Sequence, residues 1–337
     1  MQDVPITGVA TAKTVAHGGD LGTVRAKYPD APQPWIDLSA GINPLAFPVA
    51  ELPTDIWSRL PSREAEQELI AAAAARYQTD AASIVAAPGT QALIQLLPRL
   101  VGRSRVAILG PTYAEHELCW RRHGHDVVVV SRLADAAGAD VVVVVNPDNP
   151  TGRLLDRPAL RDVDARLLVV DEAFIDLLAA DASLAGELPD NAIILRSFGK
   201  TYGLAGLRLG FAIAPAPIAG RLRDELGPWA VSGPALAIGQ RALADDAWLQ
   251  ATALRLSADT RRLDSLLVAA GFAILGGTPL FRLASHPQAA GFVERLARHG
   301  IHVRAFAEQE TWLRFGLADE DGFRRLASAL QVPQNVR

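Results

Sequence analysis

The sequence contains a single cysteine, Cys119, among its 337 residues. One thiol excludes a disulfide framework and a cysteine-rich metal site, which is typical of a reducing compartment, so we predict a cytoplasmic protein without a bound metal. The N-terminal MQDVPITGVA lacks the basic and apolar regions of a signal peptide, and the longest apolar runs, such as DVVVVV, are too short to cross a bilayer. We therefore predict that the protein binds no membrane.

A large excess of charge of either sign is also missing. The 33 basic and 37 acidic side chains give a net charge of -4, without the basic face of a nucleic-acid binder. Apolar residues make up 50% of the chain, an ordinary globular composition that argues against long disordered stretches. The length is about twice that of a common single domain, so we expect one large or two medium domains.

From Ser83 onward the chain alternates short β-branched runs with amphipathic segments. SIVAA, RVAILG, DVVVV, DVVVVV, RLLVVDEA, AIILRS and LGFAIA are typical of buried strands, and helical patterns separate several of them. Such alternation predicts an α/β fold with a mostly parallel large-domain sheet flanked by helices. After Pro234, one long amphipathic segment leads into fewer and shorter elements, among them an expected strand at IHVRAF, which indicates a smaller α+β C-terminal domain.

The predicted organisation has three parts. Residues 1–45 are rich in Gly and Pro and form an N-terminal arm, residues 46–230 form the ligand-binding large domain, and residues 231–337 form the small C-terminal domain. Ligands of open α/β sheets bind beyond the carboxyl ends of the strands. The polar residues that follow each apolar run are therefore the candidate site residues.

Two motifs follow the first strands. In APGTQALIQLL, the backbone of Gly89, Thr90 and Gln91 and the Thr90 hydroxyl could hold a phosphate, although an ordinary helix N-cap explains the same residues. In GPTYAEHE, Tyr113 could stack on a planar ligand or could simply pack against its neighbours.

Two further motifs follow buried strands in the middle of the chain. In NPDNPTG, Asn146 could close a turn, and Asn149 could offer its amide to a ligand. In RLLVVDEAF, Asp171 follows an apolar run, so its carboxylate is desolvated and needs a cationic partner such as a ring nitrogen.

The segment LRSFGKTYGLAGLRLGF places Ser197, Lys200 and Arg208 in one Gly-rich passage. A lysine in such an apolar segment is suited to Schiff-base chemistry with an aldehyde, because burial lowers its pKa. The segment is not a phosphate-binding P-loop, because Ile194 stands where the first Gly is required. Together the five motifs match the phosphate, ring, ring nitrogen, ring hydroxyl and aldehyde of pyridoxal 5'-phosphate (PLP).

The ordered motifs GTQ, PTY, NPDNPTG, VVDEAF and SFGKTYGLAGLRLGF resemble the fold type I, PLP-dependent aminotransferase superfamily, in its histidinol-phosphate aminotransferase-like group. The resemblance implies that Lys200 bonds to the cofactor aldehyde, Asp171 pairs with the pyridinium and Asn149 contacts the ring 3'-oxygen. It assigns stacking to Tyr113. It assigns the cofactor phosphate to Ser197, Arg208 and the stretch Gly89, Thr90 and Gln91.

The resemblance also points to the substrate and to a partner. It places Arg314, in WLRFGL, on the carboxylate of a small amino-acid substrate, and it implies a homodimer. For a phosphate on that substrate we single out His17, Arg25 and Arg304. A solvated arm explains His17 and Arg25 equally well, and a structural ion pair could explain Arg304.

Two positions depart from the family pattern. Many members have Tyr in the DEAY motif, and here Phe174 removes that phenol and its hydrogen bond to the ring 3'-oxygen. Many also have Tyr-Pro before the first large-domain helix, where the phenol reaches the partner subunit's cofactor. Here Leu60 and Pro61 occupy the corresponding positions, so whether a cross-subunit contact replaces it is open.

The resemblance leaves three functions open. The arm HGGDLGTVRAKYP, the stretch GGTPLFRLAS and the ending WLRFGL resemble a decarboxylase branch of the group that acts on a phosphorylated amino acid. An aminotransferase for histidinol phosphate or a similar amine is the alternative. A PLP-binding module without catalysis is disfavoured, because Lys200 is present.

Overall fold

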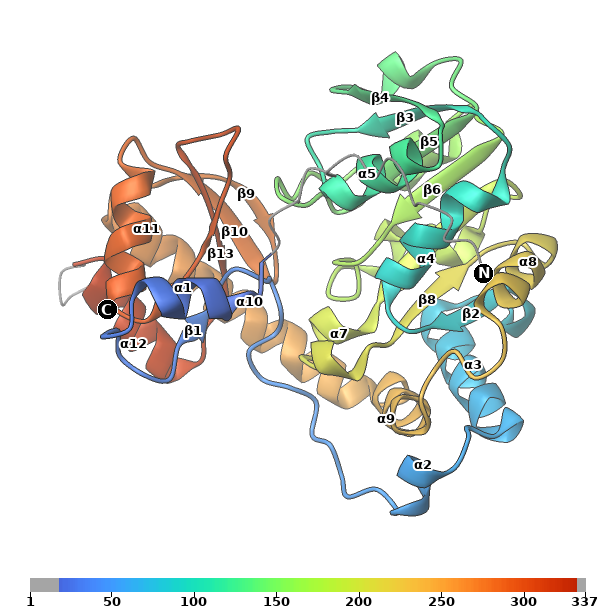
Figure 1. Ribbon diagram of the computed structural model, residues 1–337, viewed down its shortest axis with the longest axis horizontal. Coiled ribbons are helices and arrows are strands. Elements are labelled where there is room, and N and C mark those ends of the chain that lie inside the picture. The colour runs from blue at the N-terminus through green and yellow to red at the C-terminus, as the bar shows by residue number, and fades with distance from the viewer. Residues whose placement is uncertain (1–17, 332–337) are drawn as a thin grey trace, which may run out of the picture.

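The computed structural model describes residues 18–331, and the fold has two bodies joined by one long helix (Figure 1). The large body is built on seven strands, β2 (Ile84–Ala87), β3 (Arg105–Leu109), β4 (Asp126–Val130), β5 (Val141–Val145), β6 (Leu167–Asp171), β7 (Ala192–Ser197) and β8 (Gly210–Ile213). Their order is β2-β8-β7-β6-β5-β3-β4, and β8 alone runs opposite to the other six strands. The predicted mostly parallel sheet is confirmed.

Helices cover both faces of this sheet, as the apolar strands require. They are α3 (Arg63–Tyr77), α4 (Thr90–Leu96), α5 (Ala114–Arg122), α6 (Arg157–Arg161), α7 (Phe198–Thr201), α8 (Ala216–Leu226) and α9 (Gly233–Leu243). The short helix α2 (Asp55–Ser58) precedes α3 and buries none of its residues. Alternate residues of each strand pack to opposite sides: Val169 contacts the core beneath α4, α5 and α8, and Val170 contacts the core beneath α3 and α9. We call these the front and the back face.

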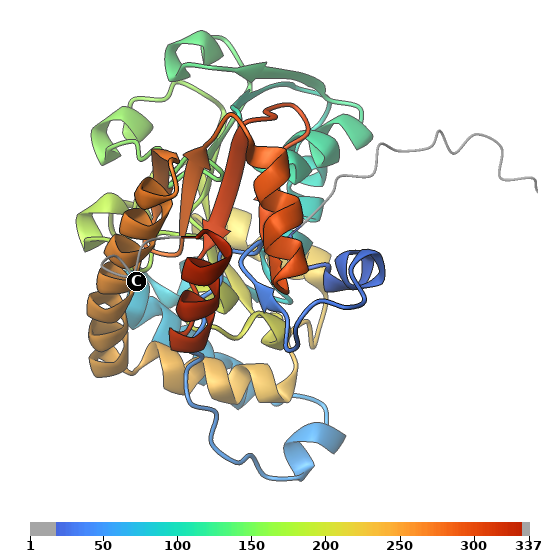
Figure 2. The same ribbon diagram turned by 90° about the vertical axis from the view of Figure 1, so that its left-hand side faces the viewer.

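The small body contains both ends of the described range, residues 18 and 331. It comprises α1 (Leu21–Lys27), β1 (Ile36–Asp37), α10 (Asp246–Ala269), β9 (Ala273–Thr278), β10 (Phe281–Ser285), α11 (Ala289–Arg298), β11 (Ile301–His302), β12 (Arg304–Ala305), β13 (Trp312–Gly316) and α12 (Glu320–Ala329). An antiparallel sheet of order β12-β13-β10-β9 carries α10, α11 and α12, which surround it in the side view (Figure 2). The predicted α+β character is confirmed.

Two elements of the small body differ from the sequence prediction. The long amphipathic segment forms two helices, because Asp245 accepts a hydrogen bond from the Trp248 amide and so begins α10 anew. The expected strand IHVRAF is split in two, with β11 pairing with β1 of the arm and β12 pairing with β13. The arm thus adds a strand to the small body, and the division into parts at residues 45 and 230 stays a prediction.

Candidate functional site

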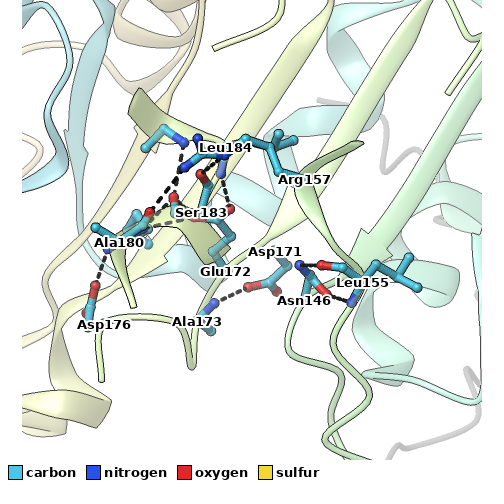
Figure 3. Close-up of polar contacts among 12 residues, drawn as sticks. Asn146, Leu155, Arg157, Asp171, Glu172, Ala173, Asp176, Ala180, Ser183 and Leu184 are labelled. Carbon is cyan, nitrogen blue, oxygen red and sulfur yellow. Dashed lines mark hydrogen bonds and ion pairs between the residues drawn. The ribbon is translucent and has the colours of Figure 1, made fainter. Parts of the chain in front are cut away.

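The candidate site lies at the carboxyl ends of β5, β6 and β7, where the parallel-strand rule places it. Asp171 ends β6 on the front face and is 3% exposed. Its Oδ1 accepts a hydrogen bond from the Ala173 amide at 3.1 Å (Figure 3). The carboxylate is therefore desolvated and fixed in orientation, as the apolar run before it predicts.

His116 in α5 is the second partner of Asp171, and the sequence reasoning missed it. Its Nε2 lies 2.9 Å from Asp171 Oδ2, and the imidazole is fully buried. The other ring nitrogen, Nδ1, has no hydrogen-bond partner within residues 18–331. The available signal was its spacing, because His116 follows Tyr113 by about one helical turn and so shares its side of the sheet.

Lys200 lies in the short helix α7, directly after β7. Its Nζ is 3.4 Å from Ser197 Oγ and 5.1 Å from the centre of the Phe174 ring. Burial lowers the pKa of Lys200, the Asp171 charge opposes this shift, and the charges of Arg314 and Arg208 add to it. The amine is accordingly a better nucleophile at neutral pH than an ordinary lysine.

A bare backbone surface lies beside the Arg208 guanidinium. Gly89 has a φ of +85°, and a Cβ added to it would stand 2.6 Å from Arg208 Nη2. A Cβ at Gly210 would stand 2.6 Å from the Thr90 amide nitrogen. Thr90 is the first residue of α4, whereas Gly89 is its N-cap, so the alternative that Thr90 is an ordinary cap is wrong.

Tyr113 is the N-cap residue of α5, and its ring lies edge-on to the His116 imidazole, with ring centres 6.2 Å apart. Its hydroxyl donates to Gln91 Oε1 at 3.1 Å, and Gln91 Nε2 donates to Glu115 at 2.9 Å. Burial raises the pKa of Tyr113 to about 12, so the phenol stays protonated at neutral pH. Gln91 therefore orients the aromatic ring rather than reaching the bare backbone with its side chain.

The two asparagines of NPDNPTG have different roles. Asn146 donates to the Leu155 carbonyl at 3.1 Å and accepts from the Leu155 amide at 2.8 Å, so it closes the turn (Figure 3). Asn149 accepts a hydrogen bond through Oδ1 from Arg314 of the small body. Its Nδ2 is the group left to donate to a ligand.

Arg314 in β13 is a buried cation, 6% exposed, that reaches across to the large body. It donates to Asn149 and to the Ser39 carbonyl of the arm, and its Nε has no hydrogen-bond partner in the part of the chain that the structure describes. Within residues 18–331 it forms no ion pair, and burial lowers its pKa to about 10, so it remains charged at neutral pH. A buried guanidinium of this kind is suited to bind an anion.

Of the three residues predicted for a substrate phosphate, two lie within the described residues. His17 lies outside the described residues. Arg25 lies on the exposed side of α1. Arg304 is directly opposite Arg314 in the β12–β13 pairing, so it is the one that borders the candidate site.

The two positions that depart from the family pattern differ in their burial. Phe174 is 2% exposed and packs edge-to-face on Phe281, with ring centres 5.0 Å apart. Arg314 lies over the other side of this pair, with its Cζ 5.2 Å from the Phe281 ring centre. Leu60, at the second departure, is 67% exposed.

The described residues fit PLP on several independent observations. Glycines keep the backbone bare beside Arg208, and Lys200 is a half-buried amine with a lowered pKa. The buried carboxylate of Asp171 stands next to His116, whose Nδ1 has no hydrogen-bond partner among the described residues. No group of His, Cys, Asp and Glu side chains within residues 18–331 could hold a metal ion. In the same range, no helix is long and apolar enough to span a membrane.

Comparison with known proteins identifies the family to which the chain belongs. The model of the family described as "Aminotransferase class I and II" matches residues 34–330. A threonine-phosphate decarboxylase from Sinorhizobium sp is 45% identical over 94% of this chain and 97% of its own length. The threonine-phosphate decarboxylase of Pseudomonas aeruginosa is 41% identical over 93% of this chain and 96% of its own length.

Solved structures show the same fold. A histidinol-phosphate aminotransferase from Sinorhizobium meliloti, in complex with pyridoxal-5'-phosphate, has a TM-score of 0.77 and 23% identity, covering 91% of this chain and 92% of its own. An L-threonine-O-3-phosphate decarboxylase from Porphyromonas gingivalis has a TM-score of 0.74 and 21% identity, covering 88% and 98%.

Proposed function

The chain belongs to the class I and II aminotransferase family, and from this premise we propose that it catalyses the PLP-dependent decarboxylation of L-threonine O-3-phosphate. The product is (R)-1-aminopropan-2-yl phosphate, the form in which the aminopropanol arm enters cobalamin biosynthesis. The observation that carries the proposal is that Lys200 and Asp171 follow neighbouring strands of the large sheet, while Arg314, from β13 of the small body, is close enough for its charge to act on Lys200. The two decarboxylase relatives, at 45% and 41% identity over nearly the whole chain, support this branch of the family.

The proposed roles of the large-body residues follow from their contacts. When bound, PLP withdraws electrons from the substrate's Cα through its protonated ring. Asp171, held by His116 and the Ala173 amide, keeps the ring nitrogen protonated. Ser197, Arg208 and the backbone of Gly89 to Gln91 hold the cofactor phosphate, while Tyr113 covers the ring and Asn149 Nδ2 donates to its 3'-oxygen.

Lys200 would hold the cofactor through its aldehyde, and its amine would move a proton at the substrate's Cα. Its lowered pKa suits both tasks, because a general acid works best when its pKa is near the operating pH. Decarboxylation requires that the bond from Cα to the carboxylate stand perpendicular to the ring, whereas transamination requires this of the C–H bond. The residues that bind the substrate's carboxylate and phosphate therefore decide whether decarboxylation or transamination occurs.

We assign the substrate anchors to the small body and the arm. Arg314 binds the carboxylate, for which its planar guanidinium is better shaped than an ammonium group. Arg304, opposite it on β12, binds the substrate phosphate. His17 and Arg25 remain proposals for the same phosphate, Arg25 from its position on the arm helix.

The test is an assay with pure protein, PLP and L-threonine O-3-phosphate, in which release of carbon dioxide is measured with and without 2-oxoglutarate. We expect release that needs no keto acid. Transfer of the amino group to 2-oxoglutarate without carbon dioxide release would instead identify an aminotransferase. Binding of PLP with neither reaction would identify a module without catalysis.

We also propose that the protein is a homodimer in the cytoplasm. Exposed apolar side chains gather on the segment that carries α2, which extends away from both bodies (Figure 1). They are Leu45, Val49, Trp57 and Leu60, with exposures of 48% to 68%. Sedimentation should give twice the chain mass for the natural protein, and Trp57→Asp should shift it toward the monomer; a natural protein that sediments as a monomer would contradict the dimer.

A further inference from the structure

Asn43 of the arm motif GINP lies against the backbone of Lys200. It is 2% exposed, and its amide donates to the Lys200 carbonyl at 2.9 Å. Its side chain donates through Nδ2 to the Thr201 carbonyl, also at 2.9 Å. The helix that bears the reactive amine is thus held from outside by one residue of the arm.

The short length of α7 makes these contacts important. A helix leaves its last four carbonyls without partners inside the helix, and α7 has only four residues, Phe198–Thr201. The arm supplies the missing donors, because Phe47 N also donates to the Tyr202 carbonyl at 2.8 Å. Without the arm, little inside α7 itself would fix the position of Lys200.

The arm and the turn that follows α7 also lie close together. Gly203 has a φ of +66°, and a Cβ there would stand 2.7 Å from Ala46 Cα and 2.8 Å from the Asn43 carbonyl oxygen. The arm backbone therefore fits directly against the turn after Lys200 and has no room to shift toward it.

Asn43 also reaches the small body. Its Oδ1 accepts from Arg255 Nη2 of α10 at 2.9 Å and from the Leu45 amide at 3.1 Å. One side chain therefore joins the arm, the lysine helix and the long helix that joins the two bodies.

We infer that Asn43 is the positioning residue for Lys200, setting the direction of its amine and coupling it to α10 through Arg255. The inference rests on the proposed function of Lys200. Asn43 touches neither the amine nor any group that would react, so it acts through the backbone of α7. Loss of its side chain should affect the geometry of the lysine more than the strength of substrate binding.

The test uses Asn43→Ala and the isosteric Asn43→Asp, which keeps the acceptor for Arg255 but cannot donate to the Thr201 carbonyl. Asn191→Ala is the matched control, because Asn191 Nδ2 donates to the Ala165 carbonyl at 2.7 Å, at the opposite end of the sheet. Hydrogen exchange in residues 199–204 is measured on protein freed of PLP. The pH titration of the visible absorbance is measured on protein loaded with PLP.

We expect exchange in residues 199–204 to quicken about tenfold in Asn43→Ala, as for loss of one or two buried hydrogen bonds, with a shifted absorbance titration and a fall in kcat rather than a rise in KM. Asn43→Asp should behave in the same direction, and it keeps the test valid if Asn43→Ala fails to fold. Asn191→Ala should change neither readout. Exchange and titration equal to those of the natural protein in both Asn43 variants would overturn the inference.

The failure of the proposed function would look different. A natural protein that shows no visible absorbance of bound PLP would overturn the role of Lys200. The exchange measurement, made without PLP, would still report whether Asn43 holds α7.

Discussion

The carboxyl ends of β6 and β7 carry charged side chains on both faces of one sheet. The two faces differ in how fully these charges are paired. On the back face, Arg196 pairs with Glu172 at 2.9 Å and with Asp176, and stacks over the Tyr77 ring at 4.4 Å. Glu172 in turn accepts from Ser183 Oγ and the Leu184 amide (Figure 3). These opposite charges are paired within the protein.

On the front face, the neighbouring residues are left partly open. Asp171 contacts a buried histidine and the Ala173 amide, Lys200 has a long contact to Ser197 and lies over the Phe174 ring, and Arg314 pairs with no carboxylate within residues 18–331. Asp171, the last residue of β6, and Glu172, the next residue of the chain, thus have different roles. Charged side chains that are paired within the protein stabilise the fold. Charged side chains without an ion-pair partner are available to bind a ligand.

The largest effect is expected for Lys200→Ala. Loss of the amine should lower turnover by about 10⁴-fold or more and remove the visible absorbance of bound PLP, because no other group replaces it. The exposed Lys27 supplies the control, since Lys27→Ala should act like the natural protein. Activity retained in Lys200→Ala would contradict the proposal that the front-face residues carry the reaction.

Asp171→Asn is expected to come next, with turnover reduced on the order of 10³-fold. The amide can keep the contact with the Ala173 nitrogen but cannot hold a proton on the cofactor ring. Steady-state rates and thermal unfolding of the protein without PLP are the measurements. Near-normal rates would contradict the proposed electron-withdrawing role.

Glu172→Gln tests the back face. Removing one charge of a buried pair should lower the free energy of unfolding by about 3 kcal/mol, because Arg196 is left undercompensated. Turnover per folded molecule should change only a few-fold. Denaturant unfolding decides the point, and an unchanged midpoint would mean that the back face does not stabilise the fold in this way.

Arg314→Gln should shift the Lys200 titration. The Arg314 charge lowers the pKa of Lys200, so its removal should raise that pKa. PLP binding to the free protein, followed against pH, should then need higher pH for the same rate. A shift to lower pH would show that the two side chains do not interact as the front face requires.

Tyr113→Phe should give the smallest change. It removes the hydrogen bond to Gln91 but keeps the ring, so PLP affinity should fall by about fivefold, as for about 1 kcal/mol. Tyr28→Phe, on the arm helix's C-terminal end, is a control that should leave affinity unaltered. A loss as large as that of Asp171→Asn would assign the phenol a role beyond orientation.

The sequence was sufficient for the strands, the mixed α/β order and the residues after each strand, because these depend on local apolar pattern and on one rule about strand ends. It was insufficient for His116, Asn43 and Ser39, whose contacts with Asp171, Lys200 and Arg314 join residues far apart in the chain. It also missed the break before α10, which one capping aspartate decides. Nothing in local pattern distinguishes Asp171 from Glu172 until the sheet sets their faces.

The comparison of the two faces is tested most directly by measuring PLP absorbance and unfolding together in Asp171→Asn and Glu172→Gln. Our account predicts that Asp171→Asn changes the pH titration of the bound PLP and leaves the unfolding of the PLP-free protein nearly unchanged. It predicts the reverse for Glu172→Gln. Equal losses of both properties in both variants, or the opposite pattern, would contradict the division of roles between the two faces.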